Sequence, residues 1–287
     1  MSVILTEMGF ELIPLSRTAT TSTVNRLASC LSNWRLVTNN QMILRIISEG
    51  YKLQLTTPVA RNSKPIYYDM NSELRHHTNQ EVQNLIRKKA IVPVEPIPEQ
   101  FTAGIFSRYK KNHTVENPRI RVVINLKPLN KHVRGIHFRM ESLANIRLFL
   151  RPDWYIASID LVDAYFNIGV HPSHQKFLRF FWESQCYQYV CLPFGLKSSP
   201  RIFSKIVKVA ITFLRRTFNI FLTSYLDDIL IMAPTYEECM KSLNTVFLVM
   251  SALGFGVSIE KSILTPSVVH KSFLITHSLT QCFFSAR

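Results

Sequence analysis

The sequence predicts an α+β protein in which helices cover one face of an antiparallel sheet. From residue 155 onward the hydrophobic patterns follow the order strand, two strands, helix, two strands, helix and strand. Strands joined by short turns pair antiparallel, and the apolar face of such a sheet is covered by helices. A hydrophobic content of 47% with 18% charged residues is typical of a chain that folds around a core.

The N-terminal segment is predicted to begin without regular structure. About the first twenty residues, ending in the Thr- and Ser-rich run 18–23, are typical of a loop or an unstructured leader. A helical pattern then starts at Val24, because Leu27, Leu31 and Trp34 are spaced to share one face.

Three helix starts are predicted from capping signals. In a capping box a Ser or Thr is followed three residues later by Glu, and proline is favoured at the first helical position. The signals are Thr78 with Glu81, Ser199 followed by Pro200, and Thr235 with Glu238. The first helix is expected to end at the proline-containing run 92–98, and the last at Gly254.

Strands are predicted where apolar and β-branched residues run together between turn residues. They cover residues 119–125, 155–160, 177–182, 187–192, 221–225 and 229–232. The third and fourth are predicted to form a hairpin. The last two flank Asp227 and Asp228, which predicts that this acidic pair lies at a second hairpin.

The charge indicates a polyanionic partner. A formal net charge of +15 is large for 287 residues and favours nucleic acid first and an acidic membrane surface second. Residues 108–139 contain nine Lys and Arg residues against a single acid, Glu116. The alternative is a solvated basic face. Phosphate contact is favoured because the predicted strand 119–125 fixes these charges on an ordered element.

The cysteines and the apolar runs limit the cellular compartments in which the protein is expected. Five cysteines without CxxC spacing and nine scattered histidines make neither a zinc pattern nor a disulfide framework. A reducing, intracellular compartment, cytoplasmic or nuclear, is therefore expected. The start of the chain carries Glu7 and Glu11 and lacks a secretory apolar run, and Arg215-Arg216 interrupts a long apolar stretch. Neither secretion nor a membrane partner is expected.

Two groups of acids stand in apolar surroundings. Asp227 and Asp228 lie between apolar runs, and Asp160 closes another run, with Asp163 in the turn after it. Burying unpaired carboxylates is costly, and if the two strands are neighbours, Asp160 and Asp227 meet and repel. Two Mg²⁺ ions would remove the repulsion and support an in-line phosphoryl transfer. The alternatives are a polar turn for the acidic pair and a helix or turn cap for Asp163.

Five segments resemble, in order and spacing, the motifs of retroelement reverse transcriptases. They are 119–131 (RIRVVINLKPLNK), 160–166 (DLVDAYF), 192–200 (LPFGLKSSP), 225–228 (YLDD), and Leu253-Gly254-Phe255 with Lys261-Ser262. The resemblance covers about residues 82–267. The chain is most similar to DIRS-like or gypsy-like retrotransposon enzymes, and the segment 25–52 favours the DIRS type.

The resemblance implies a fold and an activity. The fold is the fingers and palm of a right-hand polymerase, with an antiparallel palm sheet packed on helices and the thumb largely missing. The activity is that of an RNA-directed DNA polymerase, which adds dNTPs to a primer 3′-hydroxyl by two-metal phosphoryl transfer. The implied partners are an RNA or DNA template with primer and dNTPs. The implied cofactor is a pair of Mg²⁺ ions, with Mn²⁺ as a substitute.

The resemblance also implies a division of the chain. Its segments are a leader (1–22), an N-terminal extension (23–75), fingers (76–152), palm (153–272) with a fingers insertion around 171–192, and the start of a primer grip or thumb (273–287).

Site roles follow from the same resemblance. The implied catalytic acids are Asp160, Asp227 and Asp228, which form the metal site together with Leu161. The implied nucleotide-binding residues are Lys110, Arg121, Asp163, Ala164, Tyr165, Phe194, Gly195 and Lys261. The implied template and primer contacts are Pro193, Ser198, Pro200, Tyr225 and Leu226. Tyr165 would exclude a 2′-hydroxyl, and its alternative is a buried core aromatic.

Three departures from the family pattern keep other functions open. Phe194 stands where retroviral enzymes carry Gln, the loop 111–119 is longer than in retroviral fingers, and residues 273–275 lack the glycine of a primer grip. The alternative is a catalytically impaired retroelement remnant that binds nucleic acid. An RNA-dependent RNA polymerase is a third candidate, which Tyr165 opposes.

Overall fold

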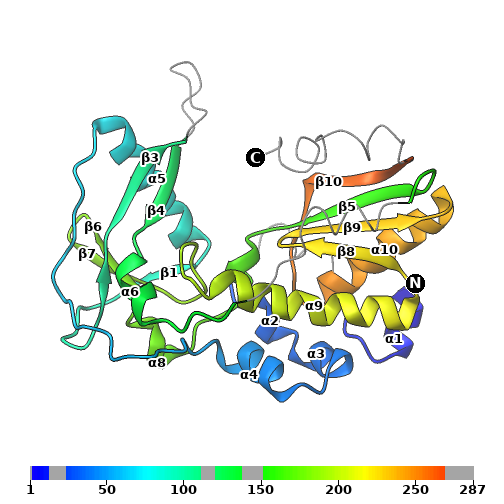
Figure 1. The fold of residues 1–287 in the computed structure, drawn as a ribbon, viewed down its shortest axis with the longest axis horizontal. Coiled ribbons are helices and arrows are strands. Elements are labelled where there is room, and N and C mark those ends of the chain that lie inside the picture. Colours follow the sequence, from blue (N-terminus) through cyan, green and yellow to red (C-terminus); the bar gives the residue numbers. More distant parts are fainter. Residues whose placement is uncertain (1, 13–23, 111–119, 138–150, 269–287) are drawn as a thin grey trace. The chain divides into compact units, whose positions relative to one another are not determined.

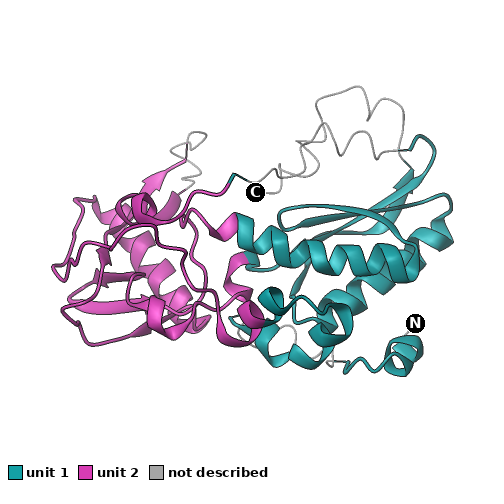
Figure 2. Cartoon of the chain, turned by 60° about the horizontal axis from the view of Figure 1, so that its bottom comes forward, with its two compact units in different colours: residues 1–44, 137–164, 201–287 teal, residues 45–136, 165–200 magenta. Residues whose placement is uncertain are grey.

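The computed structural model describes residues 2–12, 24–110, 120–137 and 151–268. The chain forms two compact units (Figure 2). The first unit contains residues 1–44, 137–164 and 201–287, and the second contains residues 45–136 and 165–200. The division into leader, extension, fingers, palm and primer grip is a functional one and stays a prediction.

The first unit is built on a four-stranded antiparallel sheet of order β10-β5-β9-β8 (Figure 1). Its strands are β5 (Tyr155–Leu161), β8 (Phe221–Tyr225), β9 (Asp228–Ala233) and β10 (Val257–Val268). The two central strands, β5 and β9, are rich in buried aliphatic residues, as a sheet covered by helices requires. The strands predicted over 155–160, 221–225 and 229–232 are confirmed, as is the hairpin that joins the last two.

Two long helices accompany this sheet, α9 (Ser199–Phe218) and α10 (Tyr236–Ala252). α10 packs against β5, β9 and β10. Thr235 caps α10 by accepting a hydrogen bond from the N–H of Glu238 at 3.2 Å, which confirms the predicted capping box. Gly254 follows the helix with φ 95°, and a Cβ there would lie 2.8 Å from the carbonyl oxygen of Arg26, so only glycine fits this stop.

Short helices form the N-terminal part of the chain: α1 (Ser2–Glu7), α2 (Arg26–Ser29), α3 (Leu31–Val37) and α4 (Gln41–Glu49). The prediction of a loop is wrong for the first residues, because α1 forms there and buries Leu5, with Phe10 buried just after it. Residues 13–23 of the predicted leader lie outside the described residues. The predicted helical face after Val24 is confirmed in part: Leu27 and Trp34 are buried, but Cys30 divides the pattern into α2 and α3, and Leu31 is half-buried. The indole N–H of Trp34 donates to the carbonyl of Leu253 at 2.9 Å.

The second unit contains a four-stranded sheet of order β1-β7-β6-β2 and a separate hairpin, β3-β4. Its strands are β1 (Ile91–Pro93), β2 (Thr102–Ala103), β3 (Ile105–Tyr109), β4 (Ile120–Ile124), β6 (Arg179–Trp182) and β7 (Gln185–Tyr189). Its helices are α5 (Ser72–Arg87), α6 (Lys127–His132) and α8 (Pro172–Gln175), and the 3-10 turn η2 (Ala164–Asn167) begins at its border. The β6-β7 hairpin confirms the predicted pairing, with β7 beginning and ending earlier than expected.

The predicted helix start at Thr78 is wrong. α5 begins earlier, because Asn71 caps it by accepting a hydrogen bond from the N–H of Leu74 at 2.9 Å. Thr78 lies inside the helix, where its hydroxyl donates to the carbonyl of Leu74, a common way to satisfy a helical Thr. The helix also ends before the run 92–98, at a turn in which Lys89 adopts φ 58°.

Apart from the short η2 and α8, the elements from β5 onward follow the predicted order β5, β6, β7, α9, β8, β9, α10, β10. Within the described ranges, no helix combines the length and apolar character that crossing a bilayer requires.

Candidate active site

Two of the predicted acids lie opposite each other on the two central strands of the first unit's sheet. Asp160 in β5 is paired with Asp228, the first residue of β9. The N–H of Leu161 donates to the carbonyl of Asp227 at 2.9 Å, so Asp160 and Asp228 form the adjacent, non-hydrogen-bonded pair. The side chains of such a pair share one face, with Cα atoms typically about 4.5 Å apart. Asp160 is only 6% exposed, so one member of this pair is buried.

The third acid, Asp227, belongs to the tight turn between β8 and β9. Tyr225 pairs with Asp228, which leaves Leu226 and Asp227 as the turn residues. Leu226 adopts φ 53°, a left-handed conformation that costs a non-glycine residue on the order of 1–3 kcal/mol. Strain of this kind clusters at functional sites, because the surrounding structure must hold it in place.

β10 bulges next to Asp160. Ser258 pairs with Asp160 and Ile263 with Ser158, so β10 takes five steps where β5 takes two. Inside the bulge the hydroxyl of Ser262 accepts a hydrogen bond from the N–H of Asp160 at 3.0 Å and donates to the carbonyl of Ser258. Ser262 therefore fixes the backbone of the buried acid. In the sequence, the one signal for Ser262 is its place in the Lys261-Ser262 motif.

The donor groups gathered here suit a hard divalent cation. Carboxylates and backbone carbonyls are the ligands of Mg²⁺, and facing carboxylates repel unless positive charge lies near them. The pairing of buried Asp160 with Asp228 is therefore compatible with a metal site. Among the residues that the structure describes, no group of three or more His, Cys, Asp or Glu side chains converges as metal ligands. The structure thus brings Asp160 and Asp228 together, and the complete set with Asp227 and Leu161 stays a prediction.

The other predicted site residues of the first unit differ in exposure. Tyr225 and Leu226 are half-buried at the hairpin, Asp163 is half-buried with φ 49°, Ala164 is buried and Lys261 is exposed on the β10 bulge. The predicted primer grip at 273–275 lies outside the described residues. The remaining predicted residues belong to the second unit.

The predicted triphosphate-binding residues of the second unit lie on the β3-β4 hairpin. Arg121 in β4 is directly opposite Arg108 in β3, and both side chains are exposed. Like charges directly opposite each other in a sheet destabilise it, so a bound anion would stabilise this pair. Lys110 follows the end of β3 and is also exposed. Arg108 is thus a further candidate anion contact, which the sequence showed only as one member of a basic run.

Aromatic rings lie around the predicted sugar-binding Tyr165. Its ring centroid is 4.8 Å from that of Phe194, and the ring centroid of Phe166 is 5.7 Å from that of Phe194. Phe194 itself is 57% exposed. An exposed aromatic ring held by two neighbours offers a flat apolar surface to a ligand. Tyr165 is half-buried, which fits neither a fully buried core residue nor a free surface residue.

The loop from Pro193 to the start of α9 is held by Asn130. The side chain of Asn130 donates to the carbonyl of Gly195 and accepts from the N–H of Lys197, both at 2.8 Å. Gly195 has φ 91°, which glycine adopts without strain. In the sequence, Asn130 is marked as a member of the 119–131 segment and not as a site residue.

The beginning of α9 corrects one prediction. Ser199 is itself the first helical residue instead of the cap before it, and its hydroxyl donates to the carbonyl of Pro193 at 2.9 Å. Pro200 is then the second helical residue. The neighbouring hydroxyl of Ser198 is buried and has no hydrogen-bond partner among the described residues.

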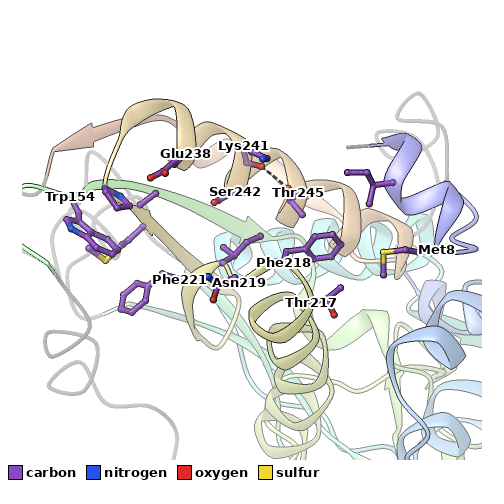
Figure 3. Close-up of a pocket in the computed structure, with 15 residues that line it drawn as sticks. Met8, Trp154, Thr217, Phe218, Asn219, Phe221, Glu238, Lys241, Ser242 and Thr245 are labelled. Atoms are coloured by element: carbon purple, nitrogen blue, oxygen red, sulfur yellow. Dashed lines mark hydrogen bonds between the residues drawn. The ribbon is translucent and has the colours of Figure 1, made fainter.

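A cavity of about 620 Å³ occupies the other end of the first unit's sheet (Figure 3). Trp154, Phe218 and Phe221 contribute aromatic surface, and Glu238 and Lys241 come from α10. It also includes Ala233, at the end of β9 opposite to Asp228. No predicted site residue lines this cavity, so it is separate from the acids.

Comparison with known proteins identifies the family. Residues 109–274, more than half of the chain, match the family described as reverse transcriptase (RNA-dependent DNA polymerase). The chain is 33% identical over 151 residues to the Gag-Pol polyprotein of Gibbon ape leukemia virus, covering 50% of this chain and 9% of that protein. It is 31% identical over 220 residues to the Gag-Pol polyprotein of Avian reticuloendotheliosis virus, covering 73% and 18%.

The fold is similar to that of a solved viral protein. The crystal structure of Prototype Foamy Virus protease-reverse transcriptase matches 88% of this chain and 34% of its own, with a TM-score of 0.59 and 18% identity. The chain therefore spans less than a fifth of these two polyproteins and about a third of the solved chain.

Proposed function

Because the chain belongs to the reverse transcriptase (RNA-dependent DNA polymerase) family, we propose that it catalyses template-directed addition of dNTPs to a primer 3′-hydroxyl. The observation that carries this proposal is the buried carboxylate of Asp160 paired with Asp228, next to the strained turn that contains Asp227. In a protein selected only for stability, this pairing of like charges would be unfavourable. In a phosphoryl transferase it concentrates negative charge where cations are needed.

The metal site of this proposal consists of Asp160, Leu161, Asp227 and Asp228, which would hold two Mg²⁺ ions, with Mn²⁺ as a substitute. When bound, the ions lower the pKa of the attacking hydroxyl and stabilise the leaving oxygen. The chain's own residues fix this geometry: the β5-β9 ladder sets the spacing of the acids, and Ser262 holds the backbone of Asp160.

Several residues proposed to recognise the nucleotide belong to the second unit. Lys110 and Arg121, joined by Arg108, would hold the triphosphate through charge-assisted hydrogen bonds. Tyr165 would lie against the sugar and exclude a 2′-hydroxyl, supported by the packing of its ring on Phe194. The template would be RNA or DNA with an annealed primer, bound largely through phosphates.

Other functional assignments extend the same proposal. Asp163, Ala164, Gly195 and Lys261 would contact the nucleotide. The template and primer contacts are Pro193, Ser198, Pro200, Tyr225 and Leu226. We assign the chain to the DIRS-like or gypsy-like retrotransposons, supported by the segment 25–52. An intracellular location is supported by the free, buried cysteines of the described residues.

A second candidate function is that of a retroelement remnant which binds nucleic acid without polymerising. It is favoured by the observation that the described residues contain no converged group of three metal-binding side chains. The two candidates differ in catalysis and agree on nucleic-acid binding, so one variant separates them.

Primer extension on an RNA template with Mg²⁺ or Mn²⁺ tests the polymerase. Asp227→Asn should abolish dNTP incorporation and leave RNA affinity nearly unchanged, because it removes a metal ligand without removing a phosphate contact. Asp69→Asn, at an exposed position of the second unit, is the matched control and should retain incorporation. If neither the folded wild type nor Asp227→Asn incorporates dNTPs while both bind RNA, the remnant function is correct. Equal incorporation by the two would show instead that Asp227 is not a metal ligand.

A further inference from the structure

All charged residues of α9 are basic. The helix contains Arg201, Lys205, Lys208, Arg215 and Arg216 and no acid. Its apolar residues, including Ile206 and Ala210, are buried. Lys205, Lys208, Thr212 and Arg216 recur at intervals of three and four residues, so they lie along one stripe of the helix. The stripe is about 16 Å long, from the helical rise over eleven residues.

This stripe lines a groove of about 430 Å³ in the first unit. Its other wall comes from the end of α3 and the start of α4, where Thr38 and Asn40 contribute polar groups. Its apolar surface includes Val209 and the half-buried ring of Phe213. The residues that line the groove carry three positive charges and no negative one, and none of them belongs to the predicted polymerase site.

The three cations are not compensated within the described part of the chain. No carboxylate in the described ranges lies within ion-pair distance of Lys205, Lys208 or Arg216. The ammonium of Lys205 lies 3.6 Å from the sulfur of Met42, which is a weak, uncharged acceptor. Like charges along one helix face destabilise it by a few tenths of a kcal/mol per pair. A bound polyanion would convert this repulsion into attraction.

We propose that the α9 groove is a nucleic-acid site which binds single-stranded RNA or DNA through its phosphates. Proteins usually bind single-stranded nucleic acid in a basic groove that contains an aromatic ring. Lys and Arg contact the phosphates of the nucleic acid, and a base stacks on the ring. A single strand has the regular negative charge that matches a linear stripe of three cations. An acidic peptide would satisfy the charges without using the ring of Phe213.

The proposal does not depend on polymerase activity. It is tested by the fluorescence anisotropy of a labelled single-stranded RNA of about 12 nucleotides, a length within the range of such sites. Binding to the full chain is measured against salt concentration without divalent metal. The triple variant Lys205→Gln/Lys208→Gln/Arg216→Gln should reduce the slope of log K against log salt by about 2, since each lost phosphate contact on a single strand accounts for about 0.7. Affinity near 0.1 M salt should fall about 100-fold.

Two controls separate this site from general charge. The variant Arg35→Gln/Arg151→Gln/Lys241→Gln removes the same charge from exposed or half-buried positions of the first unit outside the groove, and should change the slope by much less. Lys205→Arg/Lys208→Arg keeps the charge and should bind as wild type does. Equal losses in the two triple variants would overturn the proposal. So would displacement of the RNA by polyglutamate as readily as by unlabelled RNA at equal charge, which would indicate an acidic-peptide site.

The RNA-binding measurement is independent of the primer-extension test. Asp227→Asn should retain the full salt slope, because the acid is not part of the groove. Thermal unfolding of each triple variant shows whether a loss of binding reflects a loss of folding.

Discussion

Both units of the chain bury a charged side chain in a sheet, but the neighbours of the two charges differ. Arg179 in β6 is 7% exposed and donates to the side-chain oxygens of Gln188 and Gln100, both at 2.7 Å, and to the carbonyl of Glu95 at 3.1 Å. Asp160 in β5 is similarly buried, yet it is paired across the ladder with a second carboxylate, Asp228.

The difference separates structural from functional burial of charge. The guanidinium of Arg179 is surrounded by neutral acceptors of its own unit, so its burial supports the fold. A carboxylate opposite a carboxylate opposes folding, and proteins retain such local conflicts at sites where a ligand resolves them. The comparison therefore predicts opposite consequences when each charge is removed.

The largest effect is expected from Asp160→Asn. This substitution removes the negative charge of a proposed metal ligand. Such a ligand contributes several kcal/mol of transition-state stabilisation, so the rate of dNTP incorporation should fall at least about 1,000-fold. The free energy of unfolding should fall by less than in Arg179→Met below, because the substitution relieves repulsion with Asp228 and keeps the shape of the side chain. Primer extension and urea unfolding measure the two quantities. A large loss of stability would show that Asp160 is structural, as Arg179 is.

Arg179→Met should give the opposite pattern. The side-chain oxygens of Gln188 and Gln100 would lose a charged donor in a buried setting, so the free energy of unfolding should fall by about 2–4 kcal/mol. Incorporation per folded molecule should change little. The control is Arg75→Met, because Arg75 is exposed and only 3.8 Å from Glu183 in a surface ion pair, which should cost less than about 1 kcal/mol. Equal losses in urea for both variants would remove the contrast between the units.

Ser262→Ala should have a smaller effect, mainly on kcat and less on the free energy of unfolding. It removes the hydroxyl that accepts from the N–H of Asp160, and a misplaced reactive group is costly to rate, so kcat should fall about tenfold. The free energy of unfolding should fall by about 1 kcal/mol. Ser262→Thr keeps the hydroxyl and should restore kcat, and Ser267→Ala, exposed in the same strand, is the control. An unchanged kcat and an unchanged Mg²⁺ requirement would show that the bulge is only structural.

The sequence predicted the first unit better than the second, for a physical reason. β5, β8, β9 and α10 are marked by local signals: aliphatic runs, two residues between strands, and the Thr235 cap. The start of α5 was missed because Asn71 and Thr78 are both competent caps; the helix begins after Asn71 and packs against β3. The sequence led to the expectation that Asp160 would meet Asp227 if their strands were neighbours. The strands are neighbours, but the residue opposite Asp160 is Asp228, because the register of β5 against β9 is a long-range pairing that no local signal specifies.

Residues that act through backbone contacts were harder to predict than residues that carry charge. Asn130 and Ser262 hold the backbones of Gly195 and Asp160, and nothing in their own side chains indicates this. Arg108 was seen as a member of a basic run, but its position opposite Arg121 depends on the β3-β4 register. Long-range pairing decides such roles, and a single sequence contains little information about it.

The smallest expected effect on dNTP incorporation concerns the buried thiols, whose reactivity also separates the two units. Burial raises the pKa of Cys239 in α10 from 9.0 to about 11. Burial also raises the pKa of Cys186 in β7, but the nearby positive charge of Arg179 partly offsets this. Since the thiolate is the reactive form, Cys239 should be alkylated more slowly than Cys186 at neutral pH, and about 100-fold more slowly than in the unfolded chain.

The pH dependence has a definite sign. A pKa raised by folding stabilises the native state while the thiol is protonated, so this contribution is complete below about pH 9 and is lost as the pH rises toward about 11. Alkylation of Cys239 in the folded chain should therefore accelerate over that interval, as measured by mass spectrometry of each cysteine. In Arg179→Met, examined without denaturant, the thiolate of Cys186 loses its neighbouring cation, so its alkylation should slow while that of Cys239 is unchanged. If both thiols instead react faster, local opening rather than the field of Arg179 controls Cys186, and the structural role of this buried cation would include closing β6 onto β7.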